Sequence, residues 1–293
     1  MDFSIVSSFF LCRIVESSNK TKETGMRVVS LINGSLSSET SSIYALRYAK
    51  KLGCKFSLVY VQEEDYSKDL DKSFQNIKRS ADFLEVDIEL LVHENLRELK
   101  NFIKSKDVDM LFCSSRRDHS IFDRSFAQSV VKMDMEVDLA IVKVVKLFRA
   151  NSVDSVILPI RNSKLSVKKF TLFYTLALAY DAKAEIYSID KLSRRALAKV
   201  DSARIKSRLR EVVFNLRHYF RIAALMKFKF NLKHEYALAE GEKIQTHIAQ
   251  NGYDLAIVGA HHDTSFFGSH PIDVLFENPM INTIYFLPHK EDL

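Results

Sequence analysis

The hydrophobic positions of the chain alternate between short continuous runs and longer runs with helical spacing. Residues 27–32 (RVVSLI) form the first short run, which is rich in β-branched side chains, and residues 33–35 (NGS) follow as a turn signal. Apolar side chains then recur every three or four positions up to Gly53, a residue type that favours a helix end. Residues 55–61 form the next short run, so this part of the chain predicts a β-α-β unit.

This unit recurs later in the chain. Asn33 and Phe56 correspond to Arg161 and Ala184, each 128 positions further on, and residues 155–160 and 184–189 repeat the two strand patterns. Strand patterns that begin at Asp109 and Leu139 recur at Asp254 and Thr283. The additional residues of the second copy fall in 191–233, between its second and third predicted strands. An internal repeat of this kind fixes the domain organisation before any single motif does.

Each copy therefore predicts five strands alternating with helices. Continuous apolar strands of this type are buried on both faces, which is typical of a parallel sheet covered by helices on each side. The expected fold class is α/β, with two tandem five-stranded parallel-sheet domains of Rossmann-like architecture. We expect one domain over residues 26–149 and the other over 150–293, and we interpret residues 1–25 as an N-terminal extension.

Composition excludes several classes of protein. The chain is 47% hydrophobic and 27% charged, which is typical of a globular protein. Its seven glycines form neither a P-loop nor a G-x-G-x-x-G motif. The three cysteines, Cys12, Cys54 and Cys113, are too few and too dispersed for a disulfide framework or a zinc site, so we expect a reducing, cytoplasmic compartment. No apolar run is long enough for a transmembrane segment, and Asp2 argues against a signal peptide.

A ligand site is expected where the strand order of a parallel sheet reverses, beyond the carboxyl ends of the strands. The loops that matter follow the first and fourth strands of each copy. In the second copy the fourth strand ends at Gly259, whose missing side chain permits close approach of the backbone to a ligand. Further on, Gly268 and Ser269 precede a predicted helix and offer backbone N–H groups and a hydroxyl to an anion.

These residues resemble the universal stress protein family in its tandem form. The resemblance is carried by residues 29–35, 156–163, 254–262 and 268–279, and it extends over nearly all of 26–288. It implies five-stranded domains of the adenine-nucleotide alpha-hydrolase-like kind that pair through their last strands. A pseudo-twofold arrangement of the two copies follows, with further self-association into a possible homodimer. Some family members bind ATP or AMP, and others bind no nucleotide.

The chain departs from the nucleotide-binding pattern of the family, G-x2-G-x9-G-[ST]. The second copy keeps Gly259, has His262 at the second glycine, and reaches Gly268 and Ser269 after only five intervening residues. The first copy has Ser114, Arg117 and Ser125 at these places. Asn33 and Arg161 replace the acidic residue that the family's nucleotide binders carry after the first strand. We expect no nucleotide in the first copy, and the candidate nucleotide-binding residues of the second are Arg161, as a source of positive charge, Gly259, His262, Gly268 and Ser269.

Other chemistries have weaker support. His261, His262 and Asp263 offer metal-ligand chemistry, but adjacent residues rarely point at one ion, and we favour solvated loop histidines. Phe266 and Phe267 have the chemistry to stack on a base, or to fold back over the core, which we favour. No nucleophile elbow or acid–base pair is recognisable, so we expect a protein that is not an enzyme.

The insert 191–233 is strongly basic. It contains 13 Lys and Arg against two acidic residues, Asp201 and Glu211, within a chain of net charge +6. Helical spacing places Lys206, Arg210, Arg217 and Arg221 on one stripe beside an apolar face of Ile205, Leu209, Val212, Leu216, Phe220 and Ala223. Two interpretations remain open: a core-facing helix with a solvated basic side, or a docking surface for an acidic protein, nucleic acid or anionic lipid.

Together these features predict a tandem universal stress protein acting as a non-enzymatic stress-response regulator or adaptor. In this hypothesis the first copy is structural and the second is the candidate to bind an adenine nucleotide. The alternative hypothesis is an interaction module whose pockets are vestigial and whose basic helix in 191–233 binds an acidic partner.

Overall fold

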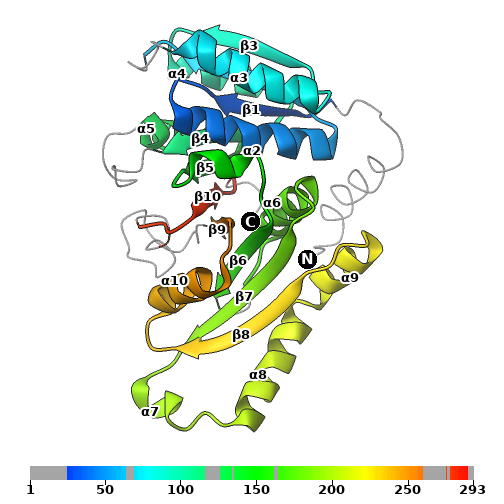
Figure 1. The fold of residues 1–293 in the computed structure, drawn as a ribbon, viewed down its shortest axis with the longest axis vertical. Helices are drawn as coiled ribbons and strands as arrows, with labels where there is room; N and C mark the ends of the chain where they lie inside the picture. The colour runs from blue at the N-terminus through cyan, green and yellow to red at the C-terminus, as the bar shows by residue number, and fades with distance from the viewer. Residues whose placement is uncertain are drawn as a thin grey trace. The chain divides into compact units, whose positions relative to one another are not determined.

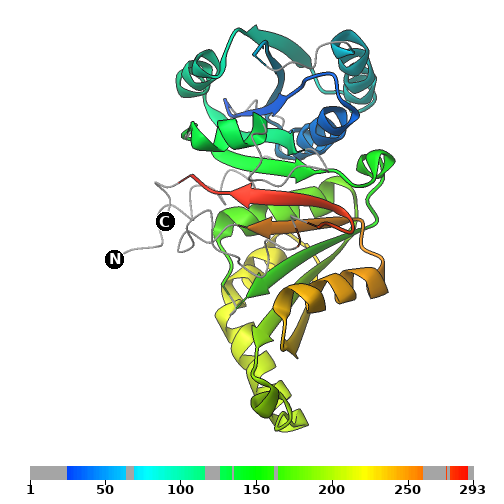
Figure 2. The same ribbon diagram turned by 90° about the vertical axis from the view of Figure 1, so that its left-hand side faces the viewer.

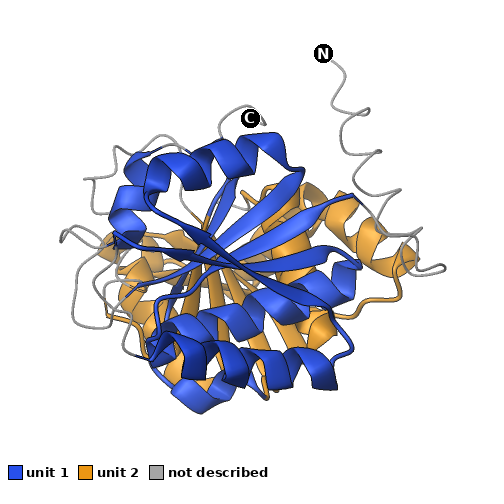
Figure 3. Ribbon diagram, turned by 90° about the horizontal axis from the view of Figure 1, so that it is seen from above, with its two compact units in different colours: residues 1–151, 287–293 blue, residues 152–286 orange. Residues whose placement is uncertain are grey.

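The computed structural model describes residues 25–63, 69–115, 126–133, 135–161, 164–259, 275 and 278–289. The chain divides into two compact units after Asn151, and residues 287–289 belong with the first unit. Figure 3 colours the two units, and helices cover both faces of the sheet in each. None of the helices in these ranges is both long and apolar enough to cross a bilayer.

The first unit is a parallel sheet with interleaved helices (Figure 1). Its strand order is β3-β2-β1-β4-β5, and every neighbouring pair is parallel. The elements are β1 (Arg27–Leu31), α2 (Leu36–Leu52), β2 (Lys55–Val61), α3 (Leu70–Phe83), β3 (Ile88–His93), α4 (Leu96–Ser105), β4 (Val108–Ser115), α5 (Phe126–Lys132), β5 (Asp138–Lys143) and the 3₁₀ turn η1 (Leu147–Ala150).

The second unit repeats this strand order with a larger helical part (Figure 2). Its order is β10-β9-β6-β7-β8, again with parallel neighbours. The elements are β6 (Ser155–Arg161), α6 (Val167–Ala179), β7 (Lys183–Lys191), α7 (Arg194–Leu197), α8 (Ser202–Asn215), α9 (Arg217–Leu225), β8 (Asn231–Ala237), α10 (Glu240–Asn251), β9 (Leu255–Gly259) and β10 (Asn282–Leu287).

Local signals in the sequence place these elements. All five residues of β9 are buried, as the continuous apolar pattern predicts for a strand covered on both faces. Ser35 caps α2 by accepting the N–H of Ser38 at 3.1 Å, and Gly53 ends this helix with a φ of 66°. The predicted α/β fold is confirmed. In each unit the strand order reverses between the first and fourth strands, so β1/β4 and β6/β9 are the switch points.

The basic insert forms helices between β7 and β8. Val212, Leu216 and Ala223 are buried as predicted. The single long helix expected here is instead divided at Leu216 into α8 and α9. Ile205 was expected on the buried face but is 42% exposed. Aromatic side chains of α6 and of residues 228–230 cover α9, where Phe170 packs on Tyr219. They do not cover the first turns of α8, where Ile205 lies.

An ion-pair cluster attaches α8 to the sheet near the carboxyl end of β7. The Arg208 guanidinium donates to Asp190 Oδ2 and to Glu211 Oε1, both at 2.5 Å. Asp190 is 8% exposed, so its charge is largely removed from water and depends on Arg208 for compensation.

We expect replacement of Arg208 by Met to destabilise the second unit, because it leaves the buried Asp190 carboxylate without its cation. The expected loss is about 1–3 kcal/mol in the free energy of unfolding, below the value for a fully buried pair because Arg208 keeps some exposure. Urea denaturation measures it. The matched change Arg210→Met, at an exposed position of the same helix, should leave the unfolding midpoint nearly unchanged; equal effects of the two changes would contradict this assignment.

Candidate functional site

The candidate site lies at the switch point of the second unit, where β6 and β9 end side by side. Arg161 is the last residue of β6 and Gly259 the last of β9. Helix α6 begins at Val167, shortly after β6. The other residues proposed from the sequence, His262, Gly268 and Ser269, lie outside the described residues, as do the neighbouring positions 261, 263, 266 and 267.

Arg161 is engaged by an acidic residue of the protein itself. Its Nε donates to Glu240 Oε1 at 2.9 Å, at the start of α10. The Glu240 side chain is only 1% exposed, so the two charges compensate each other within the fold. The positive charge that we expected Arg161 to offer to a ligand is therefore largely neutralised, because Glu240 is buried beside it.

Lys169 is the cation that the structure brings to this switch point. It lies in the first turn of α6 and is only 4% exposed, although it is charged in water. Its backbone N–H is bound by the N-cap Ser166, but its Nζ makes no hydrogen bond or ion pair with the described residues. Burial alone lowers the pKa of the Lys169 ammonium from 10.5 to about 8. The positive end of the α6 dipole adds to this uncompensated positive potential.

Gly259 and Lys169 are packed against each other. A Cβ on Gly259 would lie 2.6 Å from Lys169 Cδ and 3.1 Å from Nζ, so the lysine side chain would have to shift to make room for it. We expected Gly259 to admit a ligand to the backbone, and instead the aliphatic part of Lys169 fills that space. A nucleotide held over this glycine, as in the family, would require the Lys169 side chain to move aside.

The equivalent place in the first unit is closed by the chain itself. Asn33 Oδ1 accepts from the backbone N–H and the hydroxyl of Ser35, so its side chain organises the turn after β1. Gly34 has a φ of 83°, and a Cβ there would lie 3.0 Å from the backbone nitrogen of Leu70. Arg117 and Ser125, two of the family-related positions, lie outside the described residues. The described turn thus has a structural role.

A buried polar network on the α10 face of the second sheet was not foreseen from the sequence. His247 is 3% exposed, lies 2.6 Å from Glu185 Oε1 through Nε2, and stacks on the Tyr187 ring at 4.0 Å between centroids. Burial raises the pKa of Tyr187, and its hydroxyl donates to Glu235. Since Glu185 lies near the amino end of β7, this network is remote from the switch point and holds α10 on the sheet.

Lys169 also escaped the sequence reasoning, although a signal for it exists. Helix α6 is apolar on nearly all sides, with nine of its 13 residues buried, so a lysine within it has little water to reach. Position alone does not show this, because a long lysine side chain commonly extends to solvent from a buried stem. Only the packing over Gly259 shows that its ammonium stays inside.

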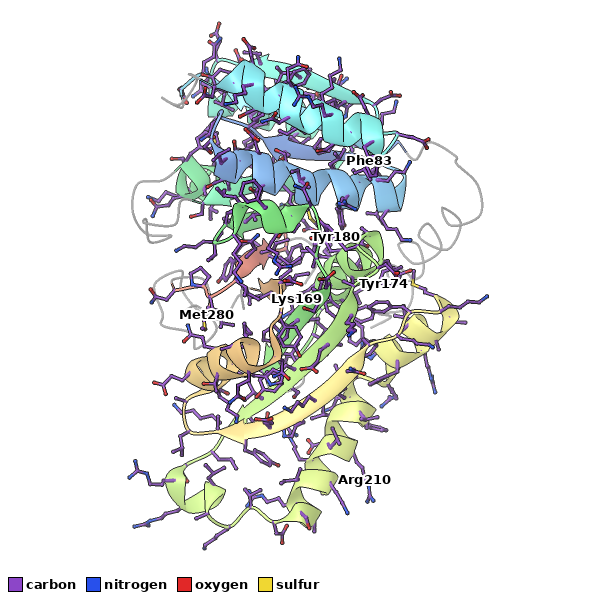
Figure 4. All side chains as sticks on the ribbon, in the orientation of Figure 1. Phe83, Lys169, Tyr174, Tyr180, Arg210 and Met280 are labelled. Atoms are coloured by element: carbon purple, nitrogen blue, oxygen red, sulfur yellow. The ribbon has the colours of Figure 1, made fainter. Side chains whose placement is uncertain are left out.

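The basic residues proposed from the sequence lie on the exterior. Lys206, Arg210, Arg217 and Arg221 are all exposed, and Figure 4 shows Arg210 on the outer side of α8. In the described ranges, no three His, Cys, Asp or Glu side chains form a group suited to a metal ion. Cys54 and Cys113 are buried.

We expect Gly259→Ala to destabilise the protein because its Cβ would overlap the Lys169 side chain. The expected cost is about 1 kcal/mol, at the low end for overpacked sites, because the overlapping atoms belong to a flexible side chain. In a Lys169→Ala background the same change should cost almost nothing, since the overlapping atoms are gone. A double-mutant cycle by urea denaturation measures this coupling, and additive effects of the two changes would show that the pair does not pack as described.

We expect the pH dependence of stability to reveal the buried ammonium. The folded-state pKa is about 8 against 10.5 for an exposed lysine, so between these values the unfolded chain binds more protons. Stability of the unchanged protein should therefore rise with pH across this window, relative to Lys169→Met. Below pH 8 the Met variant should be more stable by about 3 kcal/mol, and above pH 10.5 the difference should vanish. Parallel curves for the two proteins would contradict a buried charge.

Comparison with known proteins shows a similarity in fold. Neither a scan against family models nor a search of curated protein sequences gives a match. Among solved structures, a universal stress protein from Archaeoglobus fulgidus DSM 4304 is similar with a TM-score of 0.56 and 11% sequence identity, covering 88% of this chain and 97% of that one. The cytoplasmic domain of a prokaryotic cation chloride cotransporter is similar with a TM-score of 0.54 and 12% identity, covering 92% and 98%.

A functionally unknown protein from Pseudomonas aeruginosa PAO1 is similar to the same degree, with a TM-score of 0.54, 12% identity, and coverage of 90% of this chain and 92% of that one. Identities this low carry the fold and no detail of the site. Strand order, interleaved helices and these similarities lead to one conclusion: the chain has the universal stress protein fold.

Proposed function

We propose that this protein is a non-enzymatic regulatory module of the universal stress protein type that acts in the cytoplasm. Its second unit binds a small phosphate-bearing ligand at Lys169, and its first unit is structural. An adenine nucleotide is the first ligand to test, because the family resemblance points to it. The absence of a catalytic role is part of this proposal. The described residues at the switch point are Lys169, which has no partner among the described residues, Arg161, which is paired with Glu240, and Gly259.

The observation that carries the proposal is the buried Lys169 ammonium, for which the described residues supply no counterion. A charge held out of water costs stability unless an opposite charge or hydrogen bonds compensate it. Here the compensation found for Arg161 through Glu240 has no equivalent among the described residues. An anionic ligand bound beside this ammonium would recover the stability that its burial costs. The carboxyl ends of parallel strands, where Lys169 lies, are a common place for such ligands.

A phosphate fits the chemistry of the site. Its oxygens would accept hydrogen bonds from Lys169 Nζ, and the positive end of α6 would favour its charge. An anion beside the ammonium would raise the pKa of Lys169 from about 8 toward its ordinary value. Binding would therefore take up protons between about pH 8 and 10, a signature that a surface-bound anion would not give.

The test measures ligand binding by thermal shift and by calorimetry at pH 8.5, using inorganic phosphate, AMP and ATP. We expect at least one of them to raise the unfolding temperature at millimolar concentration, following mass action. The measured heat should depend on the ionisation enthalpy of the buffer, which reports the proton uptake. Lys169→Met should abolish both effects.

The matched control is Lys164→Met, which removes an exposed lysine close to the start of α6. It should keep both the thermal shift and the proton uptake. Binding that persists in Lys169→Met, or no binding by any of the three ligands, would overturn the proposal. If nucleotides bind but inorganic phosphate does not, Lys169 remains the proposed binding residue only when Lys169→Met abolishes nucleotide binding.

A second candidate function is that of an interaction module acting through the insert 191–233. A specific observation favours it: the outer side of α8 and α9 combines exposed arginines with exposed large apolar side chains. This function does not require the Lys169 site, and the two can exist in one molecule.

A further inference from the structure

The outward side of α8 and α9 carries one continuous line of side chains, which we call the outer stripe: Arg210, Phe214, Arg217, Arg221 and Leu225. The spacing of four, three, four and four residues keeps them on one side of a helix. All five are exposed, Phe214 to 62% and Leu225 to 82%. At the rise of an α-helix the line is about 22 Å long.

The opposite side of the same helices holds them on the protein. Val212, Leu216, Tyr219 and Ala223 are each at most 3% exposed and repeat with the same spacing. Tyr219 also donates its hydroxyl to the backbone oxygen of Leu165 at the start of α6. Because this inner face continues through the break at Leu216, the outer stripe continues through it as well. Packing and the Arg208 ion pairs therefore explain where the helices lie without using the outer stripe.

The charge on the outer stripe has no acidic counterpart within the insert. The insert has two acidic residues, of which Asp201 caps the start of α8 and Glu211 pairs with Arg208. No ion pair is found for Arg210, Arg217 or Arg221 among the described residues. The Arg217 guanidinium lies 4.1 Å from the centre of the Phe214 ring, which joins the cationic and apolar parts of the stripe.

We propose that the outer stripe docks on an anionic phospholipid surface. Lipid headgroups present phosphates to the arginines, and the acyl boundary beneath them accepts Phe214 and Leu225, as in helices that lie in a membrane interface. Nucleic acid also supplies phosphates, but it accepts an apolar side chain such as Leu225 only where its bases are unstacked. A peptide helix docks into a concave groove, whereas the two apolar side chains project outward from α8 and α9. A deformable lipid surface matches both parts of the stripe.

Further cations of the insert support this orientation. Three more exposed cations precede α8: Arg194, Arg195 and Lys199. They extend the net positive charge over the whole insert. Such a segment is attracted to a negative membrane surface over roughly one Debye length, and salt weakens the attraction.

The absence of tryptophan from the sequence provides a direct test. Leu225→Trp introduces a sole tryptophan reporter into the stripe. The matched control is Phe83→Trp on α3 of the first unit, since Phe83 is also 82% exposed. Each full-length protein is mixed with vesicles of phosphatidylserine and phosphatidylcholine, or of phosphatidylcholine alone. We expect a blue shift in tryptophan emission for Leu225→Trp with the anionic vesicles only, and none for Phe83→Trp.

A second measurement separates the stripe from general charge. In the Leu225→Trp protein, Arg217→Gln with Arg221→Gln should weaken binding to anionic vesicles by roughly 10-fold or more. Removing the same number of charges on α3, by Lys78→Gln with Arg79→Gln, should leave binding nearly unchanged. Phe214→Ala should also weaken binding, and circular dichroism confirms that each variant is folded.

Three results would overturn the proposal. The first is no emission shift for Leu225→Trp, and the second is an equal shift for the Phe83→Trp control. The third is binding of an RNA oligomer or an acidic polypeptide through the stripe without binding to anionic vesicles, which would assign the stripe to that class of partner.

Discussion

The candidate site depends on one steric constraint, the packing of Lys169 over the α-carbon of Gly259. Because no Cβ is present at Gly259, the lysine side chain crosses the end of β9 and its ammonium stays buried at the switch point. The same contact places the Lys169 side chain where a nucleotide would approach that glycine. This pair of residues thus places a cationic side chain where the family pattern would present bare backbone.

The two units show that a shared strand order does not imply a shared site. Both place their first and fourth strands side by side, where a parallel sheet can expose loops to a ligand. In the first unit the Asn33 side chain accepts a hydrogen bond within its own turn, and the backbone at Leu70 lies over Gly34. In the second unit the buried Lys169 ammonium lies at the equivalent end, and the part of the chain that the structure describes supplies no counterion for it. The difference arises from side chains and their neighbours, since the architecture is the same.

The insert separates two roles on opposite sides of one pair of helices. Its inner side is fixed by aromatic and aliphatic packing and by the Arg208–Asp190 ion pair. That attachment leaves the outer side free to carry side chains that the fold does not need. Phe214 and Leu225 remain exposed, at 62% and 82%, so their apolar surface is available to a partner surface.

The sequence by itself determined the architecture. Periodicity placed the strands near residues 27, 55, 155 and 184, and the repeat predicted two units with the same element order, because burial on both faces leaves a continuous apolar pattern. It also placed the basic side chains of Lys206, Arg210, Arg217 and Arg221 on the exterior. Only the tertiary structure showed that Arg161 is neutralised by Glu240, which lies 79 residues further along the chain. The burial of the Lys169 side chain was likewise not visible in the pattern, because burial of a flexible side chain depends on neighbours that packing brings together.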